Sequence, residues 1–120
     1  MQAKTNDTTT VRGREAEERA ARHLERHGLR VVERNFRVRG GEIDLICRDG
    51  KRLVFVEVRQ RSRSDFGGAG ASITTSKQRR IVLAAQHYLA GKPDCDCRFD
   101  CVLIDGERLE WLKDAFSADA

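Results

Sequence analysis

The chain has 120 residues, a length typical of one domain with its own hydrophobic core. Its 23 basic and 19 acidic residues give a formal net charge of +4, which is compatible with nucleic-acid binding but does not by itself indicate it. The polar residues 1–10 are unlike a secretory signal peptide, and the longest aliphatic and aromatic run, residues 53–56, is too short to cross a membrane. We therefore expect a cytoplasmic protein without a membrane partner.

The first half of the chain predicts a helix followed by strands. Alanines and a leucine recur every fourth residue over residues 11–27, which predicts a helix that ends at Gly28. Residues 29–38 predict a first strand, and a β-hairpin follows it.

The second half predicts a loop, a helix and a further strand. Residues 60–76 are rich in serine and glycine, and such long connections often carry function. Thr74 or Thr75 would cap a helix that runs to about residue 90. Residues 98–105 predict a strand that is apolar on both faces and therefore buried on both sides. Residues 109–112 predict a short edge strand or turn.

This order of elements predicts an α/β fold in which helices cover both faces of a mixed sheet. We expect one domain over residues 13–116. Residues 1–12 are predicted to be a disordered lead-in, and residues 117–120 a frayed tail.

The predicted hairpin gathers acidic side chains. Asp49-Gly50, between two β-rich runs, is a hairpin-turn signal. A four-residue loop would set Asp44 opposite Glu57, whereas a two-residue loop would set Glu42 opposite Glu57. Both loops have even length, so in either register one face carries the charged residues Glu42, Asp44, Glu57 and Arg59, and the other face carries Ile43, Leu45, Val54, Val56 and Val58.

The acidic face of this hairpin needs a compensating positive charge, because opposed Cβ atoms in an antiparallel pair are roughly 5 Å apart and like charges there are destabilising. A divalent cation could bridge the carboxylates, as Mg²⁺ does with one or two protein carboxylates plus water and phosphate oxygens. Alternatively, Arg59, Arg61 or a neighbouring basic residue neutralises them in a structural ion network. The hairpin alone leaves both explanations open.

The four cysteines allow a similar pair of explanations. Cys47 is expected to fill the core. Cys95, Cys97 and Cys101 form a C-x-C-x3-C cluster, for which His87 would supply the fourth ligand of a zinc ion. Structural zinc sites usually carry C-x2-C pairs, and reduced thiols in and before a strand are the alternative.

Several motifs run in order from about residue 13 to residue 116: Gly13, Glu17 and Ala20 with Leu24 and Gly28; Arg34-Asn35; GEIDLI at 41–46; VFVEV at 54–58; Phe66-Gly67; Lys77; and Arg98-Phe99-Asp100. Together they resemble the bacterial YraN family, a group of largely uncharacterised proteins with a restriction-endonuclease-like (PD-(D/E)XK nuclease) fold similar to that of Holliday-junction resolvases. GEIDLI followed by VFVEV is specific to this group. The resemblance implies a restriction-endonuclease-like αβββαβ core.

The resemblance also implies a nuclease site at the open end of the hairpin, with Mg²⁺ or Mn²⁺ as its cofactor. Asp44 would be the first metal-binding acid, Glu57 the acid of the E-x-K element, and the backbone carbonyl of Val58 a third ligand. Glu17, on the first predicted helix, looks like the additional acid that related resolvase-like nucleases bring to the site. Glu42 would lie just outside the site or bind a second metal.

Arg59 departs from the family pattern. The family usually has lysine at this position, where it positions the attacking water or stabilises the pentavalent phosphorus. Arginine stays protonated and cannot act as a base, although it can stabilise transition-state charge. The departure bears on catalysis and not on the fold.

The expected partner is nucleic acid, in particular DNA. Basic residues of the long loop and the second helix could line a nucleic-acid track: Arg61, Arg63, Lys77, Arg79 and Arg80. The predicted function is a metal-dependent endonuclease that hydrolyses phosphodiester bonds of branched or otherwise structured DNA, and a homodimer would cover such a substrate better. The alternatives are a non-catalytic nucleic-acid-binding protein with a degenerate nuclease site, and a cytosolic adaptor for another protein.

Overall fold

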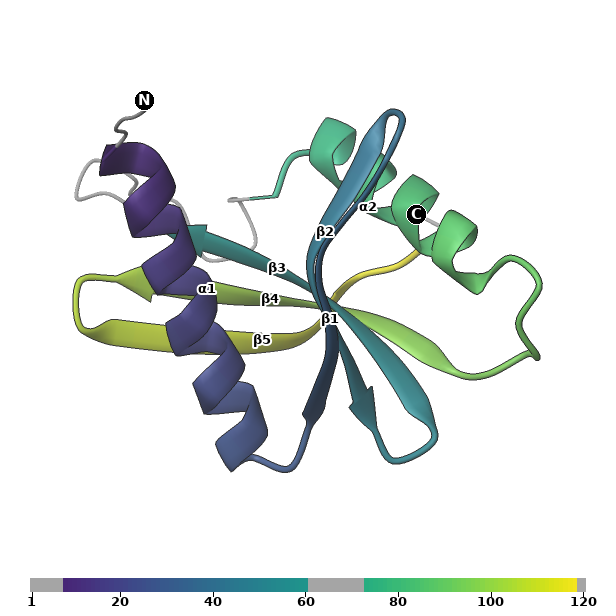
Figure 1. Ribbon diagram of the computed structural model, residues 1–120, viewed down its shortest axis with the longest axis horizontal. Helices are drawn as coiled ribbons and strands as arrows, with labels where there is room; N and C mark the ends of the chain where they lie inside the picture. Colours follow the sequence, from purple (N-terminus) through teal and green to yellow (C-terminus); the bar gives the residue numbers. More distant parts are fainter. Residues whose placement is uncertain (1–7, 61–72, 119–120) are drawn as a thin grey trace, which may run out of the picture.

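The computed structural model describes residues 8–60 and 73–118, and of residues 8–12 only the backbone (Figure 1). These residues form two helices and five strands in the order α1 (Thr8–Arg26), β1 (Arg30–Val38), β2 (Gly41–Asp49), β3 (Arg52–Gln60), α2 (Thr75–Leu89), β4 (Cys97–Asp105) and β5 (Arg108–Phe116).

The five strands form one mixed sheet in the order β1-β2-β3-β4-β5. β3 and β4 are parallel, and the other neighbours are antiparallel. A parallel pair needs a long crossover connection, and α2 supplies it. The predicted α/β class and the order α-β-β-β-α-β are confirmed, and they are consistent with a restriction-endonuclease-like core.

β5 is longer than the predicted edge strand at residues 109–112. It continues to Phe116, which lies opposite Phe99 of β4 and is buried in the core. The rings of Phe99 and Phe116 stack with their centroids 5.0 Å apart. This contact between distant segments extends the strand beyond the short apolar run that the sequence shows.

α1 begins three residues before its predicted start, so residues 8–12 of the predicted disordered lead-in belong to the helix, and residues 1–7 lie outside the described part of the chain. Gly28 follows the helix in the left-handed conformation (φ +96°). The backbone N–H groups of Gly28 and Leu29 donate to the carbonyls of Glu25 and Leu24 at 3.1 and 3.0 Å. Gly28 is therefore the C-terminal stop that the sequence predicts.

α2 begins at a threonine cap, as predicted. The Thr74 side chain accepts a hydrogen bond from the backbone N–H of Lys77 at 3.1 Å, which satisfies one free donor of the first turn. The helix ends at Leu89, close to the predicted residue 90.

The two helices cover opposite faces of the sheet, as predicted (Figure 1). The small residues Ala16, Ala20 and Ala21 of α1 pack on one face, over Leu45, Val54, Val56 and Val102. Ile81, Ala84 and Ala85 of α2 pack on the other face, over Ile46, Phe55, Phe99 and Leu103. β3 and β4 are buried on both faces because a helix covers each side.

The register of β2 and β3 is the one with Arg48 opposite Leu53, which continues toward Asp44 and Glu57. One expectation about the hairpin faces is wrong: Ile43 packs under α2, whereas Leu45 packs under α1. Strict alternation of side chains between the two faces requires β2 to stay paired with β3 along its whole length. The first residues of β2 are not paired with β3 and lie against α2 instead.

Gly41 allows this close approach of β2 to α2. A Cβ atom at this position would overlap with the backbone carbonyl oxygen of Arg80 and would lie 3.1 Å from the backbone nitrogen of Ala84. The absence of a side chain on Gly41 therefore sets the distance between the start of β2 and the first turns of α2.

Candidate functional site

The predicted acidic residues lie where β2 and β3 separate. Paired residues of the two strands end at Leu45 and Val56, although both strands continue. Just beyond this pair, the Asp44 carboxylate accepts a hydrogen bond from the backbone N–H of Val58 at 2.8 Å. A side-chain oxygen of Asp44 thus takes the place of the backbone carbonyl that would accept this hydrogen bond if β2 and β3 were still paired.

Asp44 and Glu57 form the predicted carboxylate pair. Glu57 is only 3% exposed, and Asp44 is partly buried. Burial and the charge of Glu57 raise the pKa of Asp44 from 3.8 to about 7, against the lowering effects of the Val58 N–H and of Lys77. The pair therefore stores electrostatic repulsion that an added positive charge would relieve.

Among the described residues, Lys77 supplies the positive charge that contacts this pair. Its ammonium group lies 2.9 Å from a Glu57 carboxylate oxygen, although the lysine side chain itself is 42% exposed. The sequence leaves open whether a divalent cation or a basic residue such as Arg59 or Arg61 neutralises the acids. Within the part of the chain that the structure describes, Lys77 of α2 makes the ion pair with Glu57, and Arg61 lies outside that part. Arg59 is partly exposed and, among the described residues, forms no ion pair with Asp44 or Glu57.

Glu17 approaches the pair from α1. Its pKa is raised first by burial and second by the charge of Asp44, so the two carboxylates are electrostatic neighbours. The side-chain amide of Asn35 donates a hydrogen bond to Glu17, which lowers the pKa in part. Asn35 has φ 52°, an uncommon value for a residue other than glycine in a strand, and such strain is often found at functional sites.

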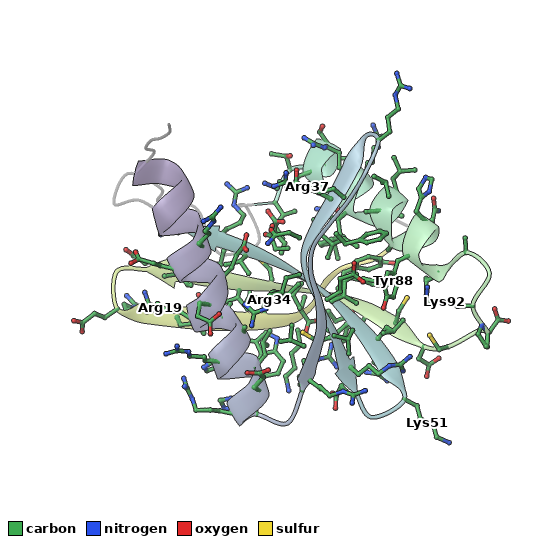
Figure 2. All side chains as sticks on the ribbon, viewed as in Figure 1. Arg19, Arg34, Arg37, Lys51, Tyr88 and Lys92 are labelled. Atoms are coloured by element: carbon green, nitrogen blue, oxygen red, sulfur yellow. The ribbon has the colours of Figure 1, made fainter. Side chains whose placement is uncertain are left out.

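Asn35 and the contact of Lys77 with Glu57 are the two features of the site that sequence reasoning missed. Arg34-Asn35 and Lys77 stand among the family motifs, but no local pattern predicts what they touch. Arg34 donates to Glu18 at 2.8 Å, so two neighbouring residues of β1 bind two neighbouring acids of α1. Figure 2 shows Arg34 on β1 beside α1.

The remaining predicted site residues lie around this centre. Glu42 is 3.5 Å from the guanidinium of Arg80, and both side chains are exposed. Arg79 is exposed on the first turns of α2. Arg61 and Arg63, like Phe66, lie outside the described residues.

A further buried carboxylate, Asp100, belongs to the core rather than to this site. It is fully buried and accepts two hydrogen bonds from Arg98, at 2.8 and 3.0 Å. Trp111 Nε1 and the backbone N–H of Asp114 each donate to it at 2.9 Å. With four hydrogen bonds and the charge of Arg98, Asp100 ties β4 to β5 and needs no metal ion.

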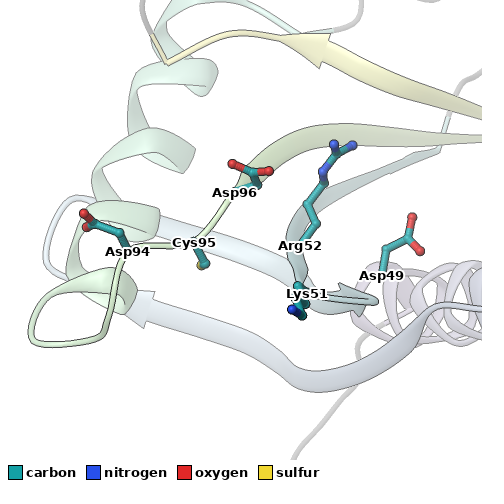
Figure 3. A pocket seen from close by; sticks show the side chains of 6 residues that line it. All are labelled: Asp49, Lys51, Arg52, Asp94, Cys95 and Asp96. Carbon is teal, nitrogen blue, oxygen red and sulfur yellow. The ribbon is translucent and has the colours of Figure 1, made fainter.

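The cysteines are divided between core and surface. Cys47 and Cys101 are buried, whereas Cys95 and Cys97 are exposed. Cys95 lines an open hollow of about 630 Å³ at the turn end of the β2–β3 hairpin, together with Asp49, Lys51, Arg52, Asp94 and Asp96 (Figure 3). Because Cys101 lies in the core under α2, it does not share this surface with the other two thiols.

The carboxylate pair fits a divalent cation that takes part of its ligands from water and substrate. Among the described residues, no three His, Cys, Asp or Glu side chains lie close enough to hold a metal. Asp44 and Glu57 therefore do not form an all-protein cage. A buried and a partly buried carboxylate that repel each other do fit Mg²⁺ or Mn²⁺, which commonly bind one or two protein carboxylates and take their other ligands from water and phosphate.

Fold and site together define an α/β protein with a mixed five-stranded sheet and a carboxylate pair, of which Glu57 is buried, where two strands separate. The model of the Uncharacterised protein family UPF0102 matches residues 16–104, and the chain belongs to this family. The resemblance to the YraN family, which is the same group, is confirmed.

Two relatives illustrate the similarity. A UPF0102 protein of Dechloromonas aromatica is 88% identical over 119 residues, which cover 99% of each chain. A UPF0102 protein of Cupriavidus taiwanensis is 62% identical over 113 residues, 92% of this chain and 86% of its own. Neither described helix of this chain has the length and apolarity that crossing a membrane requires.

Proposed function

We propose that this protein is a divalent-metal-dependent endonuclease that hydrolyses phosphodiester bonds of DNA. The observation that carries the proposal is the pair Asp44 and Glu57: a partly buried and a buried carboxylate on separating strands, with a lysine in contact with Glu57. Two carboxylates of this kind repel each other unless a cation lies between or beside them. Bound Mg²⁺ or Mn²⁺ would polarise the phosphate and lower the pKa of a water nucleophile.

The protein's own residues hold this arrangement in place. The Val58 N–H fixes one oxygen of Asp44 at 2.8 Å, and the side chains of Asp44 and Glu57 lie within hydrogen-bonding reach of each other. The buried strand β3 holds Glu57, and the paired neighbour of Glu57 on β4 is Cys101. Carboxylates on such rigid strands keep their positions with little loss of side-chain freedom.

Basic side chains around the pair favour a polyanionic substrate. Lys77, Arg79 and Arg80 lie on the first turns of α2, which contain no acidic residue. Arg34 and Arg37 act on the charge of Glu17 from β1 (Figure 2). Lysine and arginine side chains bind the phosphate backbone independently of sequence, so the substrate would be recognised by shape. A homodimer would extend this surface along branched DNA.

Arg59 supports a second candidate, a non-catalytic nucleic-acid-binding protein. This position usually carries lysine in the family, and arginine cannot act as a base. In this case DNA would bind with a steep dependence on salt but would not be cut. An adaptor for another protein would show neither behaviour.

The test is cleavage of labelled duplex, single-stranded, flapped and four-way-junction DNA with Mg²⁺ or Mn²⁺. We expect Glu57→Ala to lower cleavage at least a hundredfold while the domain stays folded, because the change removes one of two repelling carboxylates. Glu110→Ala is the matched control, since it removes an exposed carboxylate of β5.

Three results would count against a nuclease site at Asp44 and Glu57. Equal cleavage by Glu57→Ala would place the activity elsewhere. DNA binding without cleavage by the native protein, with cleavage gained by Arg59→Lys, would indicate the second candidate. Neither binding nor cleavage would favour the adaptor.

A further inference from the structure

Lys77 is the only cation that contacts the acid pair among the described residues. Its ammonium group lies 2.9 Å from Glu57, which is 3% exposed. A buried carboxylate is costly without such a partner. In the metal-free protein, Lys77 therefore provides the charge that a divalent cation would provide.

The backbone of Lys77 is held firmly, whereas its side chain can move. The backbone N–H donates to the Thr74 cap, and α2 is anchored by the buried Ile81 and Ala84. The lysine side chain is 42% exposed, and its four-carbon stem is flexible. The ammonium group can thus leave Glu57 and reach outward without any movement of the helix.

The location of Lys77 also favours an anion above the site. A lysine in the first turn of a helix lies near the positive end of the helix dipole, where acidic residues are preferred. The first turn of α2 has no acidic residue to offset this charge. The Glu57 carboxylate neutralises the charge of Lys77 on the side of the sheet. A phosphate group that approached the N-terminus of α2 from solvent would neutralise it on the exposed side.

We infer that Lys77 is a displaceable counter-ion: it neutralises Glu57 in the metal-free protein, and when a divalent cation takes over Glu57, the ammonium group turns to the phosphate of the bound DNA. This inference rests on the proposed function and adds to the expected phosphate contact of Lys77 a second role, as the ion-pair partner that a metal displaces. The lysine that contacts the phosphate is then Lys77 of α2, whereas position 59 of β3 carries an arginine.

The inference predicts opposite effects on metal binding and on cleavage. Lys77→Gln keeps a hydrogen-bond donor for Glu57 but removes the charge that competes with the metal. We expect Mn²⁺ to bind about tenfold more tightly, from Coulomb's law between a unit charge and a divalent ion about 6 Å apart in a medium like bulk water. Cleavage at saturating Mn²⁺ should fall at least tenfold, because the phosphate loses its ammonium partner.

Two further variants make the test independent of folding. Lys77→Arg keeps the charge and offers a bidentate fork to Glu57, so Mn²⁺ should bind at least threefold more weakly. Lys51→Met removes an exposed lysine at the other end of the β2–β3 hairpin and should leave both quantities within twofold of native. Mn²⁺ affinity is measured by electron paramagnetic resonance, and the fold by circular dichroism.

The outcomes separate the two proposals. Tighter Mn²⁺ binding by Lys77→Gln together with slower cleavage supports the counter-ion role. If the native protein binds Mn²⁺ and cleaves DNA but Lys77→Gln binds it equally or more weakly, or cleaves as fast, Lys77 is a structural ion-pair partner and only this inference fails. If Lys77→Gln does not fold, unchanged or tighter Mn²⁺ binding by Lys77→Arg overturns the inference. If the native protein neither binds Mn²⁺ nor cleaves, the proposed function itself fails.

Discussion

Replacing Asp44 with asparagine should stabilise the metal-free protein. The variant loses the charge beside Glu57 but keeps a side-chain oxygen. This oxygen can accept the hydrogen bond that the Val58 N–H donates to Asp44 at 2.8 Å in the native protein. The pKa of Asp44 is raised from 3.8 to about 7, first by burial and second by Glu57. At about 1.36 kcal/mol per pKa unit, ionised Asp44 lowers the free energy of unfolding by up to about 4 kcal/mol.

The expected gain is smaller than this upper limit. Part of the shift belongs to the interacting pair, and the buried asparagine amide brings its own desolvation. We expect Asp44→Asn to raise the free energy of unfolding by about 2 kcal/mol at pH 8, and Tm by about 5–10 °C for a domain of this size.

The raised pKa of Asp44 also fixes the direction in which the stability of the native protein changes with pH. Between about pH 4 and pH 7 the folded state keeps a proton on Asp44 that the unfolded state has lost, so the stability of the native protein falls as pH rises through this window. Above pH 7 this contribution is constant. The asparagine variant lacks the fall, and its advantage should be larger at pH 8 than at pH 5.

The measurement is urea denaturation at pH 5 and pH 8 with a chelator present. Asp94→Asn, an exposed change near the other end of the hairpin, is the control and should alter stability little at either pH. An Asp44→Asn variant that is less stable than native at pH 8, or whose advantage is the same at both pH values, would refute the reasoning. Asp44 would then be a stabilising partner rather than a strained member of a pair.

Two further changes test the packing around the site by urea denaturation. Arg98→Ala leaves Asp100 buried with only two of its four donors, and we expect a loss of about 3 kcal/mol; a loss below about 1 kcal/mol would mean that Trp111 and the Asp114 N–H suffice. Gly41→Ala forces a Cβ against the Arg80 carbonyl, and a loss of about 2 kcal/mol is expected; a neutral result would show that β2 and α2 can move apart freely.

Most of the fold follows from local patterns in the sequence. The four-residue repeat of small apolar residues determines α1, and Gly28 and Thr74 mark helix ends because their backbone and side-chain chemistry satisfies free helix groups. Asp49-Gly50 marks the turn, and the structure selects the longer of the two loops that the sequence allows. The shared charged face was predictable because it is the same in both registers, and the resemblance singled out Asp44 and Glu57 on it.

Other features depend on contacts between segments that are distant in the chain. β2 leaves β3 beyond Leu45 and follows α2, so Ile43 faces the opposite side from the one that strict alternation predicts. The pairing of Phe116 with Phe99 lengthens β5, and Asn35 takes a strained conformation that meets Glu17. None of these follows from periodicity, because each is decided by what packs across the sheet.

The contact between Lys77 and Glu57 shows this division most clearly. The sequence alone determined that a buried hairpin would gather acids in need of a positive charge, and it offered several basic residues nearby. Only the tertiary structure decided which one, because the approach of α2 to the sheet is set by Gly41 and by the packing of Ile81 and Ala84. A lysine twenty residues further along the chain thereby reaches Glu57, whereas among the described residues Arg59, two positions away, does not.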